Sequence, residues 1–226
     1  MIELEKLFLA YMLYSIIGWI MEVIVTIIED KELVNRGFLI GPYCPIYGVG
    51  FLGITLLLKK YMVHPIGLFF LIIGLCSAIE YITSLIMEKL FKARWWDYSN
   101  RLLNIDGRVC LINSLGFGVL GMLALYYINP YVEKIINSFS PSLINILSII
   151  LFVIHFIDII VSFKIMAKFK DKIKLINKDN TVEIKNKINE LMSNNVLTRR
   201  VKDAFPNYKP LLINGINKIK NKINKK

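Results

Sequence analysis

Long apolar runs are the feature that most limits what this chain can fold into. A helix that crosses a bilayer needs about 20 mostly apolar residues to span a ~30 Å hydrocarbon core. Hydrophobic residues make up 55% of the chain and its mean hydropathy is +0.54, well above an ordinary soluble domain. The sequence therefore predicts an all-α, polytopic transmembrane helical bundle of about five spans, near Leu7–Ile28, Ile46–Leu58, Ile66–Glu88, Leu111–Ile128 and Leu143–Phe163.

The net charge of +11 is confined to the end of the chain. Residues from Met166 onward hold 16 of the 28 Lys and Arg but 5 of the 17 acids, so the remainder is neutral. We therefore divide the chain into a transmembrane bundle, 1–165, and a basic, largely helical tail, 166–226. Such a tail is typical of a cytoplasmic segment near anionic lipid, although a coding bias also produces Lys- and Asn-rich tails. The expected partner is a membrane lipid and not a nucleic acid.

The number of spans and the basic tail together predict which side of the membrane each loop faces. About five spans and a cytoplasmic tail place the N-terminus outside and the loops Glu29–Pro45 and Lys89–Cys110 on the cytoplasmic side. Lys and Arg then gather on the inside, as the positive-inside rule requires. The tail carries an amphipathic pattern near Val182–Met192 and again in its last, basic segment. Both patterns fit a helix on the membrane surface, and a partner-binding helix fits them equally.

The segment Asn35–Gly48 is neither a polar connector nor a spanning helix. It alternates Gly and Pro with apolar residues, in the order Asn-Arg-Gly-Phe-Leu-Ile-Gly-Pro-Tyr-Cys-Pro-Ile-Tyr-Gly. Irregular backbone beside lipid must be buried in protein or line a cavity, because its peptide groups cannot face hydrocarbon. We therefore predict that this segment covers a pocket, with Asn35, Arg36 and Tyr43 as candidate ligand-binding residues.

Three acids fall inside the predicted spans at similar depth: Glu22, Glu80 and Asp158. Each lies in a polar stripe of helical spacing, which a spanning helix turns toward other helices. We expect them to line one shared chamber that binds a cation, a proton or a cationic group, with His155 nearby. The alternative is that each is protonated or bonded to a local hydroxyl, such as Ser15 or Ser84. No metal-ligand spacing accompanies them, so we predict no metal and no cofactor.

The loop Lys89–Cys110 is the second unusual segment. Its cluster Trp95–Ser99 suits the headgroup level of a membrane, and arginine forks fit phosphate or carboxylate. We take Trp96, Asp97, Asn104 and Arg108 as ligand-binding candidates, with Arg36, Arg94 and Arg101 completing a basic set for an anionic lipid headgroup. A positive-inside anchor with a Trp belt explains the same residues, and Asp97 and Asp106 then pair with the arginines. Asn129 and Pro130 are expected to end the fourth span, with Glu133 and Lys134 in a short loop.

Known catalytic signatures are missing from the sequence. It contains no G-x-x-x-x-G-K-[ST] motif for an ATPase and no G-x-S-x-G nucleophile elbow. We assign no catalytic residue.

The chain resembles a bacterial membrane-protein family described as putative ABC-transporter type IV. The likeness lies in Gly18–Glu22, Asn35–Gly48, Glu80, Trp95–Ser99, Asn104 with Gly107–Leu111, and Ala204–Pro206. The resemblance implies an integral membrane protein that is the permease part of a transporter. Since this chain has no ATPase motif, energy from ATP would come from a separate ATPase subunit.

The leading hypothesis is a permease-like protein that binds a small or ionic ligand in a polar chamber open to the cytoplasm. One small bundle is thin for a complete pathway, so a homo-oligomer is expected. Two alternatives remain open. One is a membrane enzyme acting on a lipid or lipid-linked substrate, with Glu22, Glu80 or Asp97 as acid or base. The other is a non-catalytic membrane scaffold or regulator whose tail recruits a partner.

Overall fold

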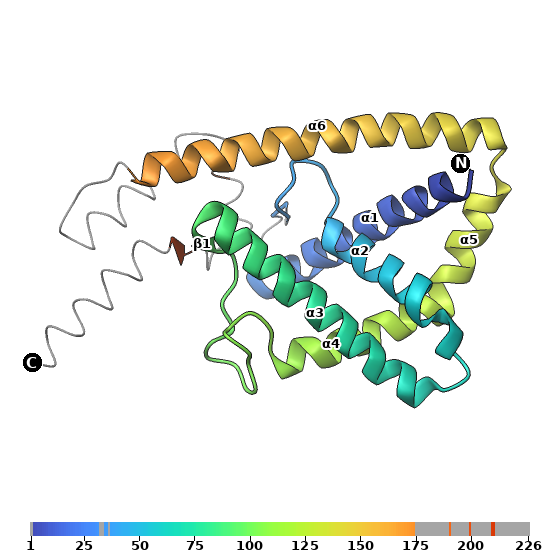
Figure 1. Ribbon diagram of the computed structural model, residues 1–226, viewed down its shortest axis with the longest axis horizontal. Coiled ribbons are helices and arrows are strands. Elements are labelled where there is room, and N and C mark those ends of the chain that lie inside the picture. Colours follow the sequence, from blue (N-terminus) through green and yellow to red (C-terminus); the bar gives the residue numbers. More distant parts are fainter. Residues whose placement is uncertain are drawn as a thin grey trace, which may run out of the picture.

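The computed structural model describes residues 2–31, 34–35, 37–174, 190, 199 and 209–210. Helices dominate this part of the chain (Figure 1). The α-helices are α1 (Ile2–Asp30), α2 (Pro45–Gly53), α3 (Pro65–Phe91), α4 (Leu111–Leu123), α5 (Asn129–Ser138) and α6 (Pro141–Lys174). Shorter elements are the π-helical turns η1 (Ile54–Leu58) and η3 (Ala124–Ile128), the 3-10 turn η2 (Lys59–Tyr61), and the strands β1 (Ala93–Arg94) and β2 (Lys209–Pro210). The predicted all-α class is confirmed.

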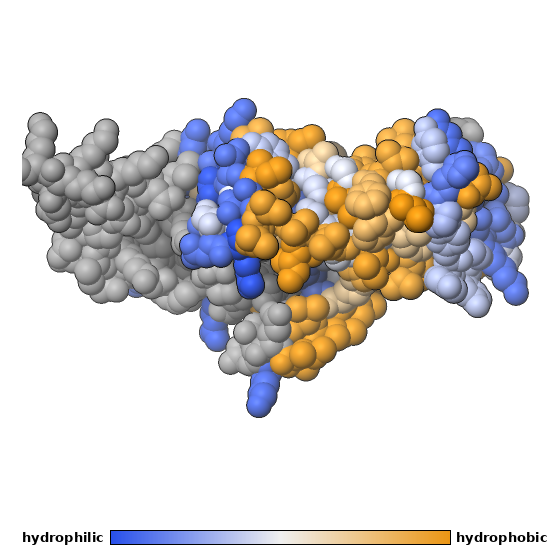
Figure 2. Space-filling view, turned by 90° about the horizontal axis from the view of Figure 1, so that it is seen from below, coloured by the Kyte–Doolittle hydropathy of each residue, from blue (hydrophilic) through white to orange (hydrophobic). Residues whose placement is uncertain are grey.

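Four helices in the described residues are long and apolar enough to cross a membrane: Ile2–Ile28, Pro65–Phe91, Leu111–Ser138 and Pro141–Lys168. Their exposed side chains form a broad hydrophobic band, with hydrophilic residues toward both ends of the described part (Figure 2). An apolar belt between two polar ends is the surface that a bilayer requires.

The predicted short span near Ile46–Leu58 is also helical, running through α2, η1 and η2 from Pro45 to Tyr61. At about 1.5 Å per residue it is roughly 25 Å long. It is therefore shorter than the four candidate membrane-spanning helices and is not counted among them. Lys59 at its end forms an ion pair of 2.7 Å with Glu133 of α5. This segment passes back through the bundle between α1 and α3 (Figure 1).

The expectation that Asn129 and Pro130 end the fourth span is wrong. The helix continues from α4 through the π turn η3 into α5 and ends at Ser138, so Glu133 and Lys134 are helical and not in a loop. Proline inside a helix removes one N–H and crowds the preceding turn. A π turn directly before Pro130 changes the local register, which accommodates the proline without ending the helix.

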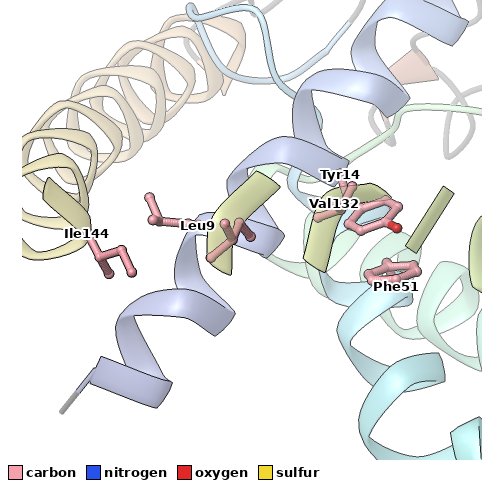
Figure 3. Close-up of a cluster of buried hydrophobic side chains, with 6 residues drawn as sticks. Leu9, Tyr14, Phe51, Val132 and Ile144 are labelled. Atoms are coloured by element: carbon pink, nitrogen blue, oxygen red, sulfur yellow. The ribbon is translucent and has the colours of Figure 1, made fainter. Parts of the chain in front are cut away.

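A buried apolar cluster packs the first helix, α1, against α2, α5 and the last long helix, α6 (Figure 3). Leu9 and Tyr14 come from α1, Phe51 from α2, Val132 from α5 and Ile144 from α6, and the rings of Tyr14 and Phe51 stack.

Close approach of α1 and α2 depends on small residues. A Cβ at Gly18 would overlap the ring of Tyr47, and one at Gly48 would overlap Ser15 and Tyr11. The missing side chain at Gly48 therefore lets α1 come close to α2. Gly74 of α3, by contrast, has no atom of the described residues within 4 Å of where its Cβ would be.

Two connectors complete the architecture. We call residues 31–44, between α1 and α2, the first connector, and residues 92–110, between α3 and α4, the second connector. β1 in the second connector pairs antiparallel with β2 of the tail, with Ala93 opposite Pro210. The predicted tail helices near Val182–Met192 and at the C-terminus lie outside the described residues.

Candidate functional site

The first connector folds into the bundle beside the middle of two helices. The backbone N–H of Cys44 donates to the carbonyl of Ser15 at 2.8 Å, and Ser15 lies halfway along α1. Cys44 is the N-cap of α2, and Pro45 takes a first-turn position where its missing N–H is harmless. The helix α2 therefore begins inside the bundle and not at its rim (Figure 1).

Asp158 of α6 holds this connector in place. Its carboxylate accepts hydrogen bonds from the N–H of Ile40 at 2.9 Å, the N–H of Gly41 at 2.7 Å and the hydroxyl of Tyr43 at 2.5 Å. Ser162, one turn along α6, donates a fourth bond at 2.9 Å. Irregular backbone in an apolar bundle needs such partners. Both carboxylate oxygens of Asp158 accept hydrogen bonds, and three of these bonds hold the first connector against α6.

Asn35 plays a similar positioning role at the start of the connector. Its side-chain oxygen accepts a bond of 2.6 Å from the indole of Trp19, and its amide donates to the carbonyl of Ile40 at 3.2 Å. The neighbouring candidate Arg36 lies outside the described residues.

Glu22 and Glu80 each meet a tyrosine from another element. The hydroxyl of Tyr47 in α2 donates to Glu22 of α1 at 2.5 Å, and the hydroxyl of Tyr98 in the second connector donates to Glu80 of α3 at 3.4 Å. Burial raises the pKa of the Tyr98 hydroxyl, and the negative charges of Glu80 and Glu22 add to that shift. The Tyr98 hydroxyl therefore stays a hydrogen-bond donor to Glu80.

Glu80 is the least satisfied acid of this group. Its side chain is 6% exposed, and its Oε2 atom has no hydrogen-bond partner among the described residues. None of those residues forms an ion pair with Glu80 or with Glu22. The hydroxyls of Ser15 and Ser84, which we weighed as local partners for the acids, bond elsewhere: Ser15 to the carbonyl of Tyr11 and Ser84 to Arg108.

A row of polar residues leads along α3 to Glu80. Ser77 donates to Ser114 of α4 at 2.7 Å, and Ser84 accepts from Arg108 of the second connector at 3.1 Å. Glu88 binds Arg108 and Arg94, each at 3.0 Å. The predicted stripe on α3 is thus turned toward α4 and the second connector, with Glu80 at its centre.

The remaining candidates of the second connector shape its own fold. Trp96 donates through its indole to the carbonyl of Arg108 at 2.9 Å, and the side chain of Asn104 bonds the backbone of Ser99, Arg101 and Gly107. Asp97 accepts from Ser99 and lies 3.6 Å from Arg94, as expected for an acid that pairs with an arginine. Asp106 instead accepts from Tyr81 at 2.7 Å.

The Trp belt expected at Trp95 is wrong for that residue. Trp95 is 2% exposed and packs edge-on against Phe38 of the first connector and Phe91 of α3. Phe163 of α6 completes the cluster. These apolar rings join both connectors, so Trp95 is buried between protein elements.

His155 lies with the first connector and not with the glutamates. Its Nε2 atom is 3.0 Å from the hydroxyl of Tyr11, and its ring meets the rings of Tyr11 and Tyr43 edge-on. Among the described residues, no group of three or more His, Cys, Asp or Glu is placed to hold a metal ion.

A family model described as "Putative ABC-transporter type IV" matches residues 9–163. The chain belongs to this family. The match covers most of the chain, from α1 into α6, and includes both connectors and the residues Glu22, Tyr47, Glu80 and Tyr98. Neither a curated protein nor a solved structure matches the chain. The ABC-transporter type IV assignment together with the apolar helices makes this a membrane protein of a transporter-like family.

The site therefore divides into two groups of sequence candidates. Glu22 and Glu80 lie with Tyr47 and Tyr98, whereas Asp158 and Tyr43 lie with the first connector and His155. Sequence reasoning missed Tyr47, Tyr98 and Glu88 as partners. The signal for the tyrosines was available, because a buried carboxylate needs a donor and both phenols lie in the two unusual segments.

Proposed function

We propose that this protein is the membrane-embedded, permease-like component of a transporter, and that it binds a small or ionic ligand between α1, α2, α3 and the second connector. The observation that carries the proposal is the buried, half-satisfied carboxylate of Glu80 beside a helix that begins inside the bundle. Discontinuous helices with polar groups near their ends are typical of substrate sites in secondary transporters.

The energy of burial supports a binding role. A charged side chain in a membrane helix costs about 2.5–3.5 kcal/mol on insertion scales, and one hydrogen bond of 3.4 Å from Tyr98 offsets little of it. A residue that only filled space would be replaced by an apolar one without loss. An intramembrane acid with a free oxygen is therefore a functional-site candidate by default.

The polar row on α3 supplies an access route. It runs from Glu88 and Arg108 at the second connector through Ser84 to Glu80. We infer that this end faces the cytoplasm, with the basic tail on the same side and the N-terminus outside, because Lys and Arg gather there. The chamber would then be reached from the cytoplasmic surface.

Two partners follow from this function. A separate ATPase subunit would dock at the cytoplasmic end and supply energy, since the sequence has no phosphate-binding loop. A second copy of this chain would complete the pathway. Gly74 and Ala78 support such a copy, because both are exposed on α3 and four residues apart, a spacing that admits a neighbouring helix.

The contacts of Arg94 and Arg108 do not favour a second function in binding an anionic lipid headgroup. Arg94 and Arg108 pair with Glu88, and Arg94 also lies 3.6 Å from Asp97, which leaves their guanidinium groups less available to an anionic lipid headgroup. The enzyme and scaffold alternatives therefore serve as outcomes of the test.

The test compares a deletion strain carrying the wild-type gene, Glu80→Gln or Glu22→Gln. Glu133→Gln is the matched control, because Glu133 is an acid on α5 in an ion pair with Lys59 at the other end of the bundle. We expect altered solute content and uptake in the deletion strain and in both site variants, and normal values with the control. An altered lipid species with unaltered solutes would overturn transport in favour of an enzyme. Loss on deleting residues 166–226 alone, with Glu80→Gln normal, would favour a scaffold.

A further inference from the structure

Glu22 and Glu80 are the two acids near Tyr98, and no ion pair of the described residues gives either of them a basic partner. Glu22 and Glu80 each accept one phenol hydrogen bond, from Tyr47 and Tyr98 respectively. The nearest basic residues of the second connector are engaged elsewhere, since Arg94 and Arg108 both bind Glu88. Two carboxylates with one phenol hydrogen bond each, in an apolar bundle, leave a demand for positive charge that no ion pair of the described residues meets.

The free Oε2 atom of Glu80 shows where that charge would bind. It is buried and unpartnered, while Oε1 receives the bond from Tyr98. A carboxylate oxygen in this state accepts hydrogen bonds from a cationic donor at short range. An anionic ligand is excluded, because its charge would repel both glutamates.

The same geometry separates monovalent from divalent cations. A divalent ion takes about six or more oxygen ligands, and the described residues hold no group of three or more His, Cys, Asp or Glu placed for a metal ion. Each of the two carboxylates already holds one phenol hydrogen bond, and one buried oxygen, Oε2 of Glu80, stays unpartnered among the described residues, which suits a single cationic group.

We propose that Glu22, Glu80, Tyr47 and Tyr98 form a binding site for one monovalent cationic group, carried either by an ammonium group of a small solute or by an inorganic ion. This inference rests on the proposed function and names the ligand class of its site. The ammonium hydrogens would bond Oε2 of Glu80, with Glu22 supplying the second negative charge and Tyr47 holding Glu22 in place.

The test measures binding to the purified full-length protein in detergent, and so does not depend on transport. Intrinsic fluorescence is the readout, because all three tryptophans lie near the site: Trp19 is one turn from Glu22 on α1, and Trp95 and Trp96 precede Tyr98. Methylammonium, putrescine, sodium and potassium chloride are titrated separately at constant ionic strength, with sulfate as the anionic probe.

We expect saturable binding of at least one cationic probe, at least a tenfold loss of affinity in Glu80→Gln and in Glu22→Gln, and no change in Glu133→Gln. A response to methylammonium or putrescine alone identifies an ammonium group, and a response to sodium or potassium identifies an inorganic ion. Equal affinity in wild type and Glu80→Gln, or saturable binding of sulfate alone, would overturn the inference. If the protein binds a cation but the Glu80→Gln strain has normal cellular solutes, the cation site stands and the transport proposal is overturned.

Discussion

The hydroxyl of Tyr43 lies 2.5 Å from the carboxylate of Asp158, and this contact joins the first connector to the middle of α6. The same carboxylate binds the backbone of Ile40 and Gly41. Sequence spacing alone placed Asp158 in a chamber with Glu22 and Glu80. The contacts instead give it a structural task, in which it supplies the hydrogen bonds that irregular backbone inside a bundle requires.

Replacing Asp158 by Ala is expected to release the first connector. Two part-buried N–H groups would lose their acceptor, at a cost toward the lower end of about 1–3 kcal/mol each, and the hydroxyl of Tyr43 would lose its partner. Hydrogen exchange measured by mass spectrometry should show faster exchange at Ile40 and Gly41, with a lower Tm in detergent. Ser162→Ala removes one of the four bonds and leaves the connector attached, so its exchange should stay near wild type. Unchanged exchange in Asp158→Ala would show that other contacts hold the connector.

The packing of α1 against α2 is expected to reject any side chain at Gly18. A Cβ there overlaps the ring of Tyr47, and overpacking typically costs about 1–3 kcal/mol. Gly18→Ala should therefore lower the Tm and also disturb the bond from Tyr47 to Glu22. Gly116→Ala is the matched control in α4, since no atom lies within 4 Å of that Cβ position. Equal Tm values for the two variants would contradict the close approach of α1 and α2.

Arg108 is expected to stabilise the second connector. It is 6% exposed and bonds Ser84 and Glu88. Removing one partner of a buried ion pair typically costs about 3–5 kcal/mol, so Arg108→Ala should lower the Tm strongly. Arg101→Ala, at an exposed position of the same connector, should leave it unchanged. If both variants instead lost bound anionic lipid at unchanged Tm, the arginines would form a headgroup site.

A second copy of the chain is expected to pack on the exposed side of α3. Ala78→Cys should form a disulfide between copies in native membranes after mild oxidation, visible as a doubled mass on a non-reducing gel. The native Cys44 and Cys110 are buried, whereas Cys76 is half-buried on the same helix, so the experiment uses a Cys76→Ser background. Ile154→Cys, on an exposed face of α6, is the positional control. Cross-linking at Ile154 and not at Ala78 would place the interface on α6.

Hydrophobic periodicity predicted the helices well because membrane helices are set by length and apolarity. The polar stripes through Tyr11 and Glu22, Ser77 and Ser84, and Ser148 and Ser162 were also predicted to face other elements, and they do. The continuation through Pro130 was not predictable, since a π turn depends on local register and leaves no clear trace in sequence. The burial of Trp95 was missed because it needs Phe38 and Phe163, which are distant in the chain.

The candidate site was predicted only in part, for a physical reason. Spacing gives the face and depth of Glu22, Glu80 and Asp158, but not which irregular segment returns to meet them. The backbone of the first connector donates hydrogen bonds to Asp158, and Tyr98 of the second connector donates one to Glu80. Connectors of this kind are placed by tertiary contacts, so the split of the three acids into two groups became visible only in the structure.

Glu80→Gln tests the central claim most directly, because it separates function from stability in one variant. If Glu80 serves a ligand, removing its buried charge should leave the Tm unchanged or raise it, since the described residues give that charge no ion pair. Solute uptake in the complemented strain should nevertheless fall to the level of the deletion strain. A Glu80→Gln protein that is less stable and yet supports normal uptake would contradict the account and make Glu80 a structural residue.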